Sequence, residues 1–495
     1  MSKSMTRRNF LGAAAAVPLV SGLTSAVANP STRPATDRPN ILWIAVEDIS
    51  PFLGCYGHAN ATPNLDRLAK GGVRFARAFM PAPVCSACRS ALITGQMQTT
   101  LGTHNHHSSR TEETAIRLPD HVTTLPELFR KAGYFTFNQG KDDYNFWYDR
   151  EDLYAGPYTT HALYGKSGGR KVAWKDRRAG QPFFGQIQLY GGKEIFSKSF
   201  ESRVRNPIDR DSLDLPPYYP DVPEVREDWA RHYDSIQITD DRVGEILDQL
   251  RQDGLLEKTV VIFFSDHGMR LWRHKQFCYD TGLHVPLIMS WAGNPERLGG
   301  AGTVRRDLVS GLDLAATSLA LAGLAVPDCM ESRDLFALGF QPRDHVISAR
   351  DRCDYTIDRI RSVRTGRFRY IRNFFHDRPY MQPNYRDEWE ITQLMRRLHA
   401  EGKLNDVQDR FWSKERPAEE LYDIENDPHE IHNLAFDPRH RSVLMKHRTI
   451  LSQWIDETDD QGRYPEDSAN LKYMLDVWRG RGVEPVNPEY DHLKG

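Results

Sequence analysis

Two apolar runs of the chain end directly in acidic residues. Residues 41–46 (Ile-Leu-Trp-Ile-Ala-Val) precede Glu47 and Asp48, and residues 260–264 (Val-Val-Ile-Phe-Phe) precede a Ser-Asp pair that ends at Asp266. A run that is apolar at every position is typical of a strand that is buried on both faces of a parallel sheet. We therefore expect both runs to be central strands of one sheet.

Segments with helical periodicity lie between the expected strands. Thr62 and Pro63 fit the N-cap and the first position of a helix. Apolar positions three and four apart predict further helices over residues 125–132 and from about residue 229 to 250, and residues 183–189 predict another strand. The alternation predicts an α/β fold with a mainly parallel sheet. Ligands of such sheets bind off the carboxyl ends of the strands, where both acidic groups lie.

The pattern of apolar and polar residues changes after residue 324. Four short segments predict strands of a smaller sheet, and a charged, helical insertion is expected at about residues 386–415. The expected short strands cover residues 345–348, 360–363, 368–371 and 421–423. A length of 495 residues exceeds one ordinary domain. We predict a large catalytic domain over residues 39–343 and a C-terminal subdomain over residues 344–495.

Charge and composition exclude some classes of partner. The formal net charge is −2, with 39% hydrophobic and 27% charged residues, which fits a soluble globular protein. No global field attracts the chain to nucleic acid or to a membrane surface, so we expect no nucleic-acid partner. Any anion-binding site must be a local cluster of basic residues.

The N-terminus has the pattern of an export signal. Arg7-Arg8 begins a twin-arginine pattern, followed by a weakly apolar stretch and a small-x-small cleavage site that ends at Ala28. The alternative is a short membrane anchor, but Pro18 breaks the stretch, which is shorter than the ~20 residues that a spanning helix needs. We predict a twin-arginine signal peptide over residues 1–28, export to the periplasm or beyond, and no membrane span in the mature protein.

The segment Cys85-Ser86-Ala87-Cys88-Arg89 has several explanations as a CxxC motif. It could be half of a zinc site, a redox pair or a structural disulfide of an exported protein. Zinc usually needs a second such pair, and the remaining cysteines are widely spaced: Cys55, Cys278, Cys329 and Cys353. A thioredoxin-like redox motif belongs to a much shorter βαβ unit.

The same segment, which continues into small and apolar residues, resembles the signature of type I sulfatases, the formylglycine-dependent sulfatase family. In that family the first cysteine is oxidised to formylglycine, and the hydrated aldehyde attacks sulfur. The resemblance implies that Cys85 becomes the nucleophile, that Arg89 is catalytic, and that a sulfatase-maturing enzyme is a partner. The family usually has proline where this chain has Ala87, and alanine variants are matured by a radical maturase. A disulfide with Cys88 would block maturation.

The two acidic motifs resemble the family's metal motifs. In the family an apolar strand ends in two acidic residues that bind calcium, and a later motif pairs an aspartate with Asn or His. The resemblance implies a Ca²⁺ site, with Mg²⁺ as the alternative ion, held by five residues: Glu47, Asp48, Cys85, Asp266 and His267. Glutamate replaces the usual aspartate at the first position. The alternative for the first pair is a solvated acidic turn.

Two lysines fall where the family binds sulfate. Lys275 precedes a Val-Pro-Leu-Ile passage, and Lys141 follows Gly140 where the family has Gly-Lys-x-His. The resemblance implies that both lysines contact the sulfuryl group. Position 143 is aspartate instead of histidine, so the base that releases sulfate is either Asp143 or a nearby histidine cluster. That cluster is His104, His106 and His107, and its alternative is a surface loop or an adventitious metal site.

Three further basic residues are candidate substrate-binding groups. Lys193 lies in a turn where the family has a histidine, and the alternative is a turn lysine that faces solvent. Arg350 and Arg352 lie in a charge-rich stretch similar to one in heparan N-sulfatase-like members. They either hold an acidic sugar bidentately or belong to an ion-pair network inside the C-terminal region.

The resemblance covers about residues 40–435. It implies an alkaline-phosphatase-like fold, with a large mixed sheet between helices and a smaller C-terminal domain with an antiparallel sheet. The implied function is hydrolysis of a sulfate ester or N-sulfate, on a sulfated carbohydrate. Two alternatives are a phosphoester hydrolase of the same fold and a sulfoglycan-binding protein without catalysis.

Overall fold

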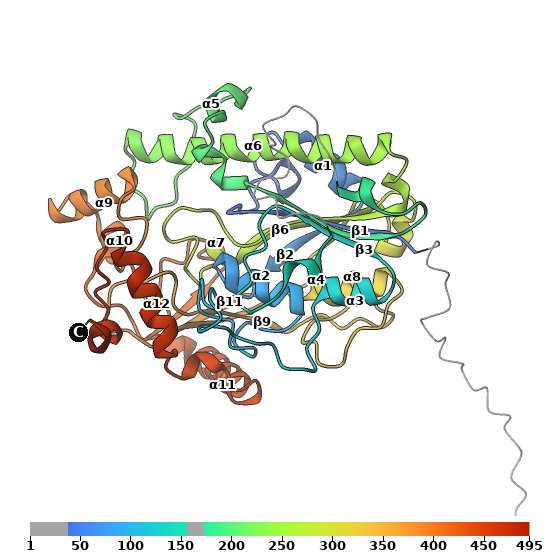
Figure 1. Cartoon of the computed structure of the whole chain (residues 1–495). Helices are drawn as coiled ribbons and strands as arrows, with labels where there is room; N and C mark the ends of the chain where they lie inside the picture. The colour runs from blue at the N-terminus through green and yellow to red at the C-terminus, as the bar shows by residue number, and fades with distance from the viewer. Residues whose placement is uncertain (1–37, 156–172, 495) are drawn as a thin grey trace, which may run out of the picture.

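The computed structural model describes residues 38–155 and 173–494. The predicted signal peptide over residues 1–28 lies outside the described residues. Figure 1 shows a large sheet flanked by helices and, beside it, a smaller C-terminal sheet with its own helices. Among the described helices, none combines the length and the apolar character that crossing a membrane requires.

The large sheet is mixed and has the strand order β3-β4-β1-β5-β6-β2-β7, with β8 paired to β2. Its strands are β1 (Asn40–Val46), β2 (Val73–Phe79), β3 (Phe135–Gln139), β4 (Phe183–Leu189), β5 (Thr259–Ser265), β6 (His284–Trp291), β7 (Thr303–Arg305) and β8 (Val309–Ser310). The first four strands in this order are parallel, whereas β6 is antiparallel to β5 and β2. The three strands expected from the apolar runs are confirmed.

The register of the parallel strands brings their ends together. Val46 of β1 pairs with Leu189 of β4 on one side and with Ser265 of β5 on the other. Every residue of β1 and β5 is buried, as expected for strands in the middle of a covered sheet. The residues that follow the three strands therefore lie at one edge of the sheet.

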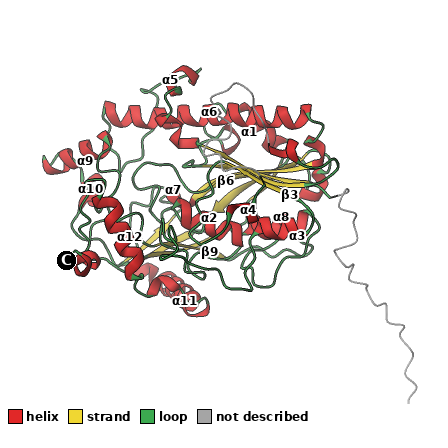
Figure 2. Cartoon of the chain, in the orientation of Figure 1, coloured by secondary structure: helices red, strands yellow, loops and turns green. Residues whose placement is uncertain are grey.

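Helices cover both faces of the large sheet (Figure 2). The helices α1 (Pro63–Lys70) and α6 (Pro223–Gln252) share a core with one set of strand side chains. The helices α2 (Cys85–Thr94), α3 (Leu125–Lys131) and α8 (Asp313–Leu321) pack on the other face. The helix expected from about residue 229 begins earlier, with Pro223 at its first position. Short helices α4 (Arg150–Leu153), α5 (Phe200–Arg203) and α7 (Asp280–Leu283) complete this part.

The C-terminal sheet is antiparallel and has the order β12-β11-β10-β9. Its strands are β9 (His345–Arg350), β10 (Ile360–Thr365), β11 (Phe368–Asn373) and β12 (Glu419–Asp423), and the helices are α9 (Glu390–Ala400), α10 (Asp406–Asp409), α11 (Arg441–Glu457) and α12 (Ser468–Arg479). The charged insertion contains α9 and α10, so its helical character is confirmed. The domain division at residue 343 stays a prediction.

The small sheet is joined to the large domain beside the start of α2. The amide of Ala349 donates to the carbonyl of Pro81 at 2.9 Å, and the Ser348 hydroxyl donates to the carbonyl of Met80 at 2.8 Å. The amide of His106, in the loop after α2, donates to the carbonyl of Arg352 at 2.9 Å. Strand β9 therefore fixes both the entry and the exit of α2.

Candidate active site

Charged side chains collect where four neighbouring parallel strands end. Glu47 and Asp48 follow β1, Asp266 follows β5, and Lys141 comes two residues after β3. Lys193 follows β4 on the 3₁₀ helix η4 (Gly191–Phe196). The strand order places β3, β4, β1 and β5 side by side, so these residues meet although they are far apart in the sequence.

Cys85 is the first residue of α2 and points into this group of charges. Its side chain is 2% exposed, and its sulfur lies 3.2 Å from Nε2 of His267 and 3.2 Å from Nζ of Lys275. Arg89 is one helical turn later and shares a face of α2 with Cys85. Cys85 and Cys88 are both free thiols, and Cys88 packs in the apolar core under α2. The structure therefore contains no disulfide between them.

The surrounding ion pairs link the strand ends to one another. Nζ of Lys275 lies 2.9 Å from a carboxylate oxygen of Asp48, and Nζ of Lys141 lies 3.2 Å from Glu47. Lys193 also contacts Glu47, on the second carboxylate oxygen. Arg89 reaches the other strand, with Nη2 at 3.0 Å from Asp266. These contacts connect seven of the predicted site residues: Glu47, Asp48, Arg89, Lys141, Lys193, Asp266 and Lys275.

The cations determine the charge state of the group. Burial by itself would raise the pKa of the Cys85 thiol, but the charges of Lys141, Lys275 and Lys193 lower it well below its usual value. Burial would also raise the pKa of the Glu47 carboxyl, and Lys141, Lys193 and Arg89 instead hold it below its ordinary range. The cations around position 85 thus favour an anionic group there.

The donor set beside Cys85 fits a divalent metal ion. Single ligand atoms of Asp48, Cys85 and His267 all lie within 4.8 Å of one another. Nε2 of His267 is 3.5 Å from a carboxylate oxygen of Asp48 and 3.5 Å from one of Asp266. Nδ1 of His267 is 2.9 Å from the carbonyl of Gly268, and donation there leaves Nε2 as the acceptor that faces the carboxylates. If Cys85 is converted to formylglycine, its sulfur stands in for an oxygen, which suits a hard cation.

Two glycines allow η4 to lie against the metal-binding strand end. A Cβ on Gly191 would lie 2.1 Å from the carbonyl oxygen of Glu47, and one on Gly192 would lie 2.4 Å from that of Asp48. Asp48 itself has φ of +59°, a conformation that is uncommon outside glycine and is concentrated at functional sites. Only glycine at both positions lets Lys193 reach Glu47 from the neighbouring strand end.

The histidine cluster after α2 divides into two parts. A ring nitrogen of His106, the sulfur of Cys85 and a carboxylate oxygen of Asp143 all lie within 4.8 Å of one another. Nδ1 of His106 lies 3.2 Å from Asp354, and His107 lies 3.1 Å from Asp354 and 3.6 Å from Asp143. His104 is not part of this group, because its electrostatic neighbour is Asp460 in the C-terminal domain. The structure thus brings His106 to Cys85, places His107 beside Asp143 and Asp354, and leaves His104 outside this group.

The two arginines of the charge-rich stretch are engaged in ion pairs. Arg350 pairs with Asp358 in the buried interior of the small sheet. Arg352 pairs with Glu466 at 2.6 Å, and it also donates to the carbonyl of His106 at 2.8 Å. The network that we considered as the alternative is therefore the arrangement in the structure. A role for either arginine in substrate binding stays a prediction.

Several residues near the site had no signal in the sequence. Gln188 of β4 accepts from Nη1 of Arg89 at 2.7 Å. Arg386 donates to the carbonyl of Lys275 at 3.1 Å and so fixes the loop that carries that lysine. Asp354 orients both histidines from the C-terminal domain. These partners come from elements that only the tertiary fold brings together, and neither spacing nor residue type marks them in the chain.

Comparisons with known proteins agree with this arrangement. The Sulfatase family model matches residues 39–324, and a model described as "N-sulphoglucosamine sulphohydrolase, C-terminal" matches residues 267–414. An ulvan-active sulfatase from Formosa agariphila is 32% identical over 92% of this chain and 80% of its own length. Human N-sulphoglucosamine sulphohydrolase is 30% identical over 86% of this chain and 91% of its own length.

Solved structures give the same fold. A 2-O GAG sulfatase has a TM-score of 0.61 at 22% identity, and the match covers 88% of this chain and 96% of that one. The expected architecture, a large mixed sheet between helices with a smaller antiparallel sheet, is thereby confirmed. Sulfatases generally use formylglycine and a divalent metal, and the described residues include a group, Asp48, Cys85 and His267, that could hold a metal ion. The chain belongs to the sulfatase family.

Proposed function

We propose that this protein hydrolyses sulfate groups on a glycan, with a formylglycine made from Cys85 and with Ca²⁺ in the cluster of Glu47, Asp48, Asp266 and His267. Two full-length relatives are named for ulvan and for N-sulphoglucosamine, so both O-sulfated and N-sulfated sugars are candidate substrates. The maturing enzyme and the twin-arginine export predicted from residues 1–28 are part of this proposal.

One observation carries the proposal. Cys85 lies at a buried position where Lys275 and His267 contact its sulfur and where Lys141 and Lys193 act on it electrostatically. A sulfuryl group carries its charge on oxygens that need several fixed cations in the transition state. A thiol that served only as a redox or structural group would not need this many positive charges.

The residues of the chain divide the chemical work. Formylglycine at position 85 would supply, as its hydrate, the oxygen that attacks sulfur and the aldehyde that re-forms when sulfate leaves, while a bound divalent ion would withdraw charge from the sulfate oxygens. Arg89, Lys141 and Lys275 would stabilise the developing charge on the sulfuryl oxygens. Lys275, whose Nζ lies 3.2 Å from the sulfur of Cys85, is also placed to donate a proton to the departing oxygen or nitrogen.

The base that releases sulfate has two candidates within the described residues. The family position is Asp143, whose carboxylate pairs with Lys141 at 3.0 Å and with Arg110 at 2.6 Å. These cations, together with His107, lower the pKa of Asp143 well below its usual value although burial acts in the opposite direction. A carboxylate held so acidic is a poor base. We therefore assign removal of the hydroxyl proton at position 85 to His106, with Asp354 orienting the ring.

The mass of the peptide that contains Cys85 is the decisive measurement. The mature protein purified from its native host should show the mass of an aldehyde in place of the thiol. A peptide with an unmodified cysteine, or with a disulfide to Cys88, would contradict the proposed mechanism and favour a sulfoglycan-binding protein without catalysis.

Matched aryl esters separate a sulfatase from a phosphoester hydrolase of the same fold. The mature protein should hydrolyse para-nitrophenyl sulfate faster than para-nitrophenyl phosphate. Dialysis against a chelator should reduce the sulfatase rate, and added Ca²⁺ should restore it, because the carboxylate cluster binds hard cations. A faster rate on the phosphate ester would contradict the proposed sulfatase function.

A further inference from the structure

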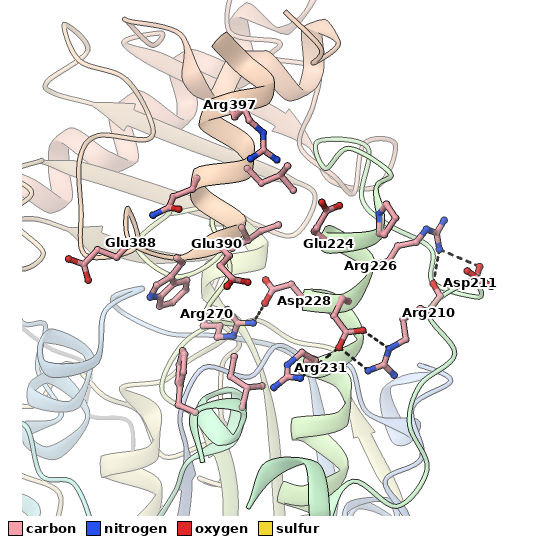
Figure 3. Close-up of a pocket in the computed structure, with 18 residues that line it drawn as sticks. Arg210, Asp211, Glu224, Arg226, Asp228, Arg231, Arg270, Glu388, Glu390 and Arg397 are labelled. Atoms are coloured by element: carbon pink, nitrogen blue, oxygen red, sulfur yellow. Dashed lines mark hydrogen bonds and ion pairs between the residues drawn. The ribbon is translucent and has the colours of Figure 1, made fainter. Parts of the chain in front are cut away.

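A pocket of about 990 Å³ lies between the catalytic domain and helix α9 of the C-terminal domain. Its walls are the first turns of α6, the end of η4 and the start of α9 (Figure 3). In this view Arg397 points from α9 toward the opening, and Glu224 lies opposite on α6. The volume matches that of pockets that hold organic ligands several rings in size.

Three segments connect the pocket to the active site. The 3₁₀ helix η4 has Lys193 against Glu47 and, three residues later, Phe196 in the wall of the pocket. Arg270 follows the Asp266-His267 pair by three residues and also lines the pocket. The segment before α9 begins at Tyr385, whose ionisation is affected by the charges of Lys275 and Asp48, and reaches the pocket at Trp389. Each of these three segments therefore carries residues of the Cys85 site and, a few positions later, residues that line the pocket.

Aromatic rings form one wall of the pocket. The rings of Phe196 and Trp389 have centroids 5.9 Å apart, and Phe196 is 59% exposed. The Arg270 guanidinium lies 5.8 Å from the Phe196 ring and 5.4 Å from the Trp389 ring. Arg270 is itself neutralised by an ion pair with Asp228. An exposed phenylalanine beside a half-buried tryptophan gives an apolar surface of the size of a sugar ring.

The charged residues of the pocket that form no ion pair are mainly acidic. Arg210 pairs with Glu227, and Arg226 and Arg231 pair with acidic residues at the rim. Within the described residues, four lining carboxylates have no ion pair or hydrogen bond, and Arg397 is the lining arginine without a hydrogen-bonded partner. These carboxylates belong to Asp211, Glu224, Glu388 and Glu390. Free carboxylates accept hydrogen bonds from hydroxyl groups and repel sulfate.

We propose that this pocket binds uncharged sugar units next to the unit that loses its sulfate, with ring faces on Phe196 and Trp389 and hydroxyl groups on the free carboxylates. The inference rests on the proposed glycan sulfatase function and adds a charge preference to it. The cluster around Cys85 binds the sulfated sugar unit, whereas this pocket favours sugar units without sulfate. Substrates with isolated sulfate groups are thus favoured over chains that are sulfated on every unit.

The test compares short and long substrates. Para-nitrophenyl sulfate serves as the small substrate, and two hexasaccharides of neutral sugars without uronic acids, one with a single sulfate group and one sulfated on every unit, serve as the long ones. The variant Phe196→Ala should raise the ratio of the hexasaccharide KM to the para-nitrophenyl sulfate KM about tenfold, which corresponds to about 1.4 kcal/mol. The matched control is Phe436→Ala, because Phe436 is 78% exposed and lines another surface. That control should leave the ratio at the wild-type value.

A second variant tests the charge preference without removing an aromatic ring. Glu224→Lys should lower the KM for the highly sulfated hexasaccharide by about threefold, the effect of one partly exposed charge pair. Glu224 has no ion pair within the described chain, so this change breaks no internal contact.

The outcomes separate this inference from the proposed function. If the wild-type protein hydrolyses none of the sulfate esters, the proposed function fails. If it desulfates a hexasaccharide but Phe196→Ala changes both KM values equally, or Glu224→Lys leaves the sulfate preference unchanged, the pocket is not a sugar site and the inference is overturned. Hydrolysis of para-nitrophenyl sulfate with no activity on either hexasaccharide would also overturn it.

Discussion

The chain buries two dense groups of charges, and they are organised differently. In the C-terminal domain the Arg361 guanidinium lies 2.7 Å and 2.8 Å from the two carboxylate oxygens of Asp460, and its Nη2 is 3.0 Å from Asp351. Each charge there has a partner with matched geometry. Around Cys85, in contrast, Lys141, Lys193 and Arg89 share Glu47 and also surround a thiol. We call the Arg361 group closed, because its charges contact only one another. We call the Cys85 group open, because its cations surround the reactive sulfur atom of Cys85.

The difference separates a structural cluster from a catalytic one. A closed bidentate pair stabilises the fold by preventing an uncompensated buried charge. Cations held around a reactive atom instead stabilise charge that develops there. Both groups are assembled from residues that lie far apart in the sequence, so the criterion is where the charges point in the fold. Variants in each group should therefore fail in different ways.

The largest effect is expected for the nucleophile. Cys85→Ala should reduce sulfatase kcat at least about ten-thousandfold, the magnitude seen when a nucleophile is removed. The thermal unfolding midpoint should stay close to the wild-type value, because alanine fits the first position of α2. Steady-state rates on para-nitrophenyl sulfate measure the loss.

The control for this variant is Cys329→Ala, since Cys329 is a half-buried free thiol outside the site. It should retain full activity. Residual activity of Cys85→Ala within a hundredfold of wild type would mean that another residue is the nucleophile.

Arg361→Met should be the most destabilising change in the closed group. It leaves Asp351 buried without its cation and Asp460 with only Arg359, 3.8 Å away, and loss of one partner from a buried pair costs about 3–5 kcal/mol. Chemical unfolding measures the free energy of unfolding. The folded fraction should keep its kcat, because Arg361 contacts no residue of the Cys85 group within the described chain. A loss of kcat with unchanged stability would mean that Arg361 acts in catalysis and is not a structural residue.

Lys141→Met should show the opposite combination. Removing one cation from the sulfuryl site should lower kcat by about 100- to 1000-fold. The free energy of unfolding should fall by less than about 2 kcal/mol, because Glu47 retains Lys193 and Arg89, and Asp143 retains Arg110. Rates and unfolding curves of the same preparation decide the outcome. A stability loss as large as that of Arg361→Met would mean that Lys141 is structural.

The sequence predicted the parts of the site that are local in the chain. Apolar runs that end in acidic residues placed Glu47, Asp48 and Asp266 at strand ends, and the i, i+4 spacing placed Arg89 over Cys85. The sequence could not show which charged residues pair only with one another and which surround the reactive cysteine. Arg350 and Arg352 resemble substrate-binding residues until Asp358 and Glu466 are found opposite them, and both partners lie in other elements.

Tertiary contacts also decide which histidines matter. The spacing of the cluster did not distinguish His104 from His106, because both follow the nucleophile segment closely. The loop after β9 makes the distinction, because it holds Asp354 beside His106. In the fold, five strands of the large sheet were not predicted from the sequence: β2, β3, β6, β7 and β8. In β2 the alternation of buried and half-buried residues is interrupted by a register shift against β6. Such irregular strands lack a clean period.

The smallest effect concerns a histidine beneath the open group. His232 of α6 lies behind the active site, where a Cβ on Gly192 would be 3.0 Å from its Cε1 atom. Neither ring nitrogen has a hydrogen-bond partner, and burial, helped by the charge of Arg270, lowers the pKa of His232 to about 3. Between pH 6.5 and 3 the unfolded chain binds this proton and the folded chain does not. Stability is therefore lost as the pH falls through that window.

His232→Leu should remove this contribution to the pH dependence. Between about pH 6.5 and pH 5 the wild-type protein should lose about 2 kcal/mol more free energy of unfolding than the variant does, at about 1.4 kcal/mol per pH unit. Unfolding curves at both pH values measure the difference, and His492→Leu, a change at an exposed histidine, is the matched control. Arg361→Met leaves His232 in its buried position, so this variant should keep the contribution of His232 to the slope. An unchanged slope in His232→Leu would show that the open group, and not its histidine neighbour, takes up the proton.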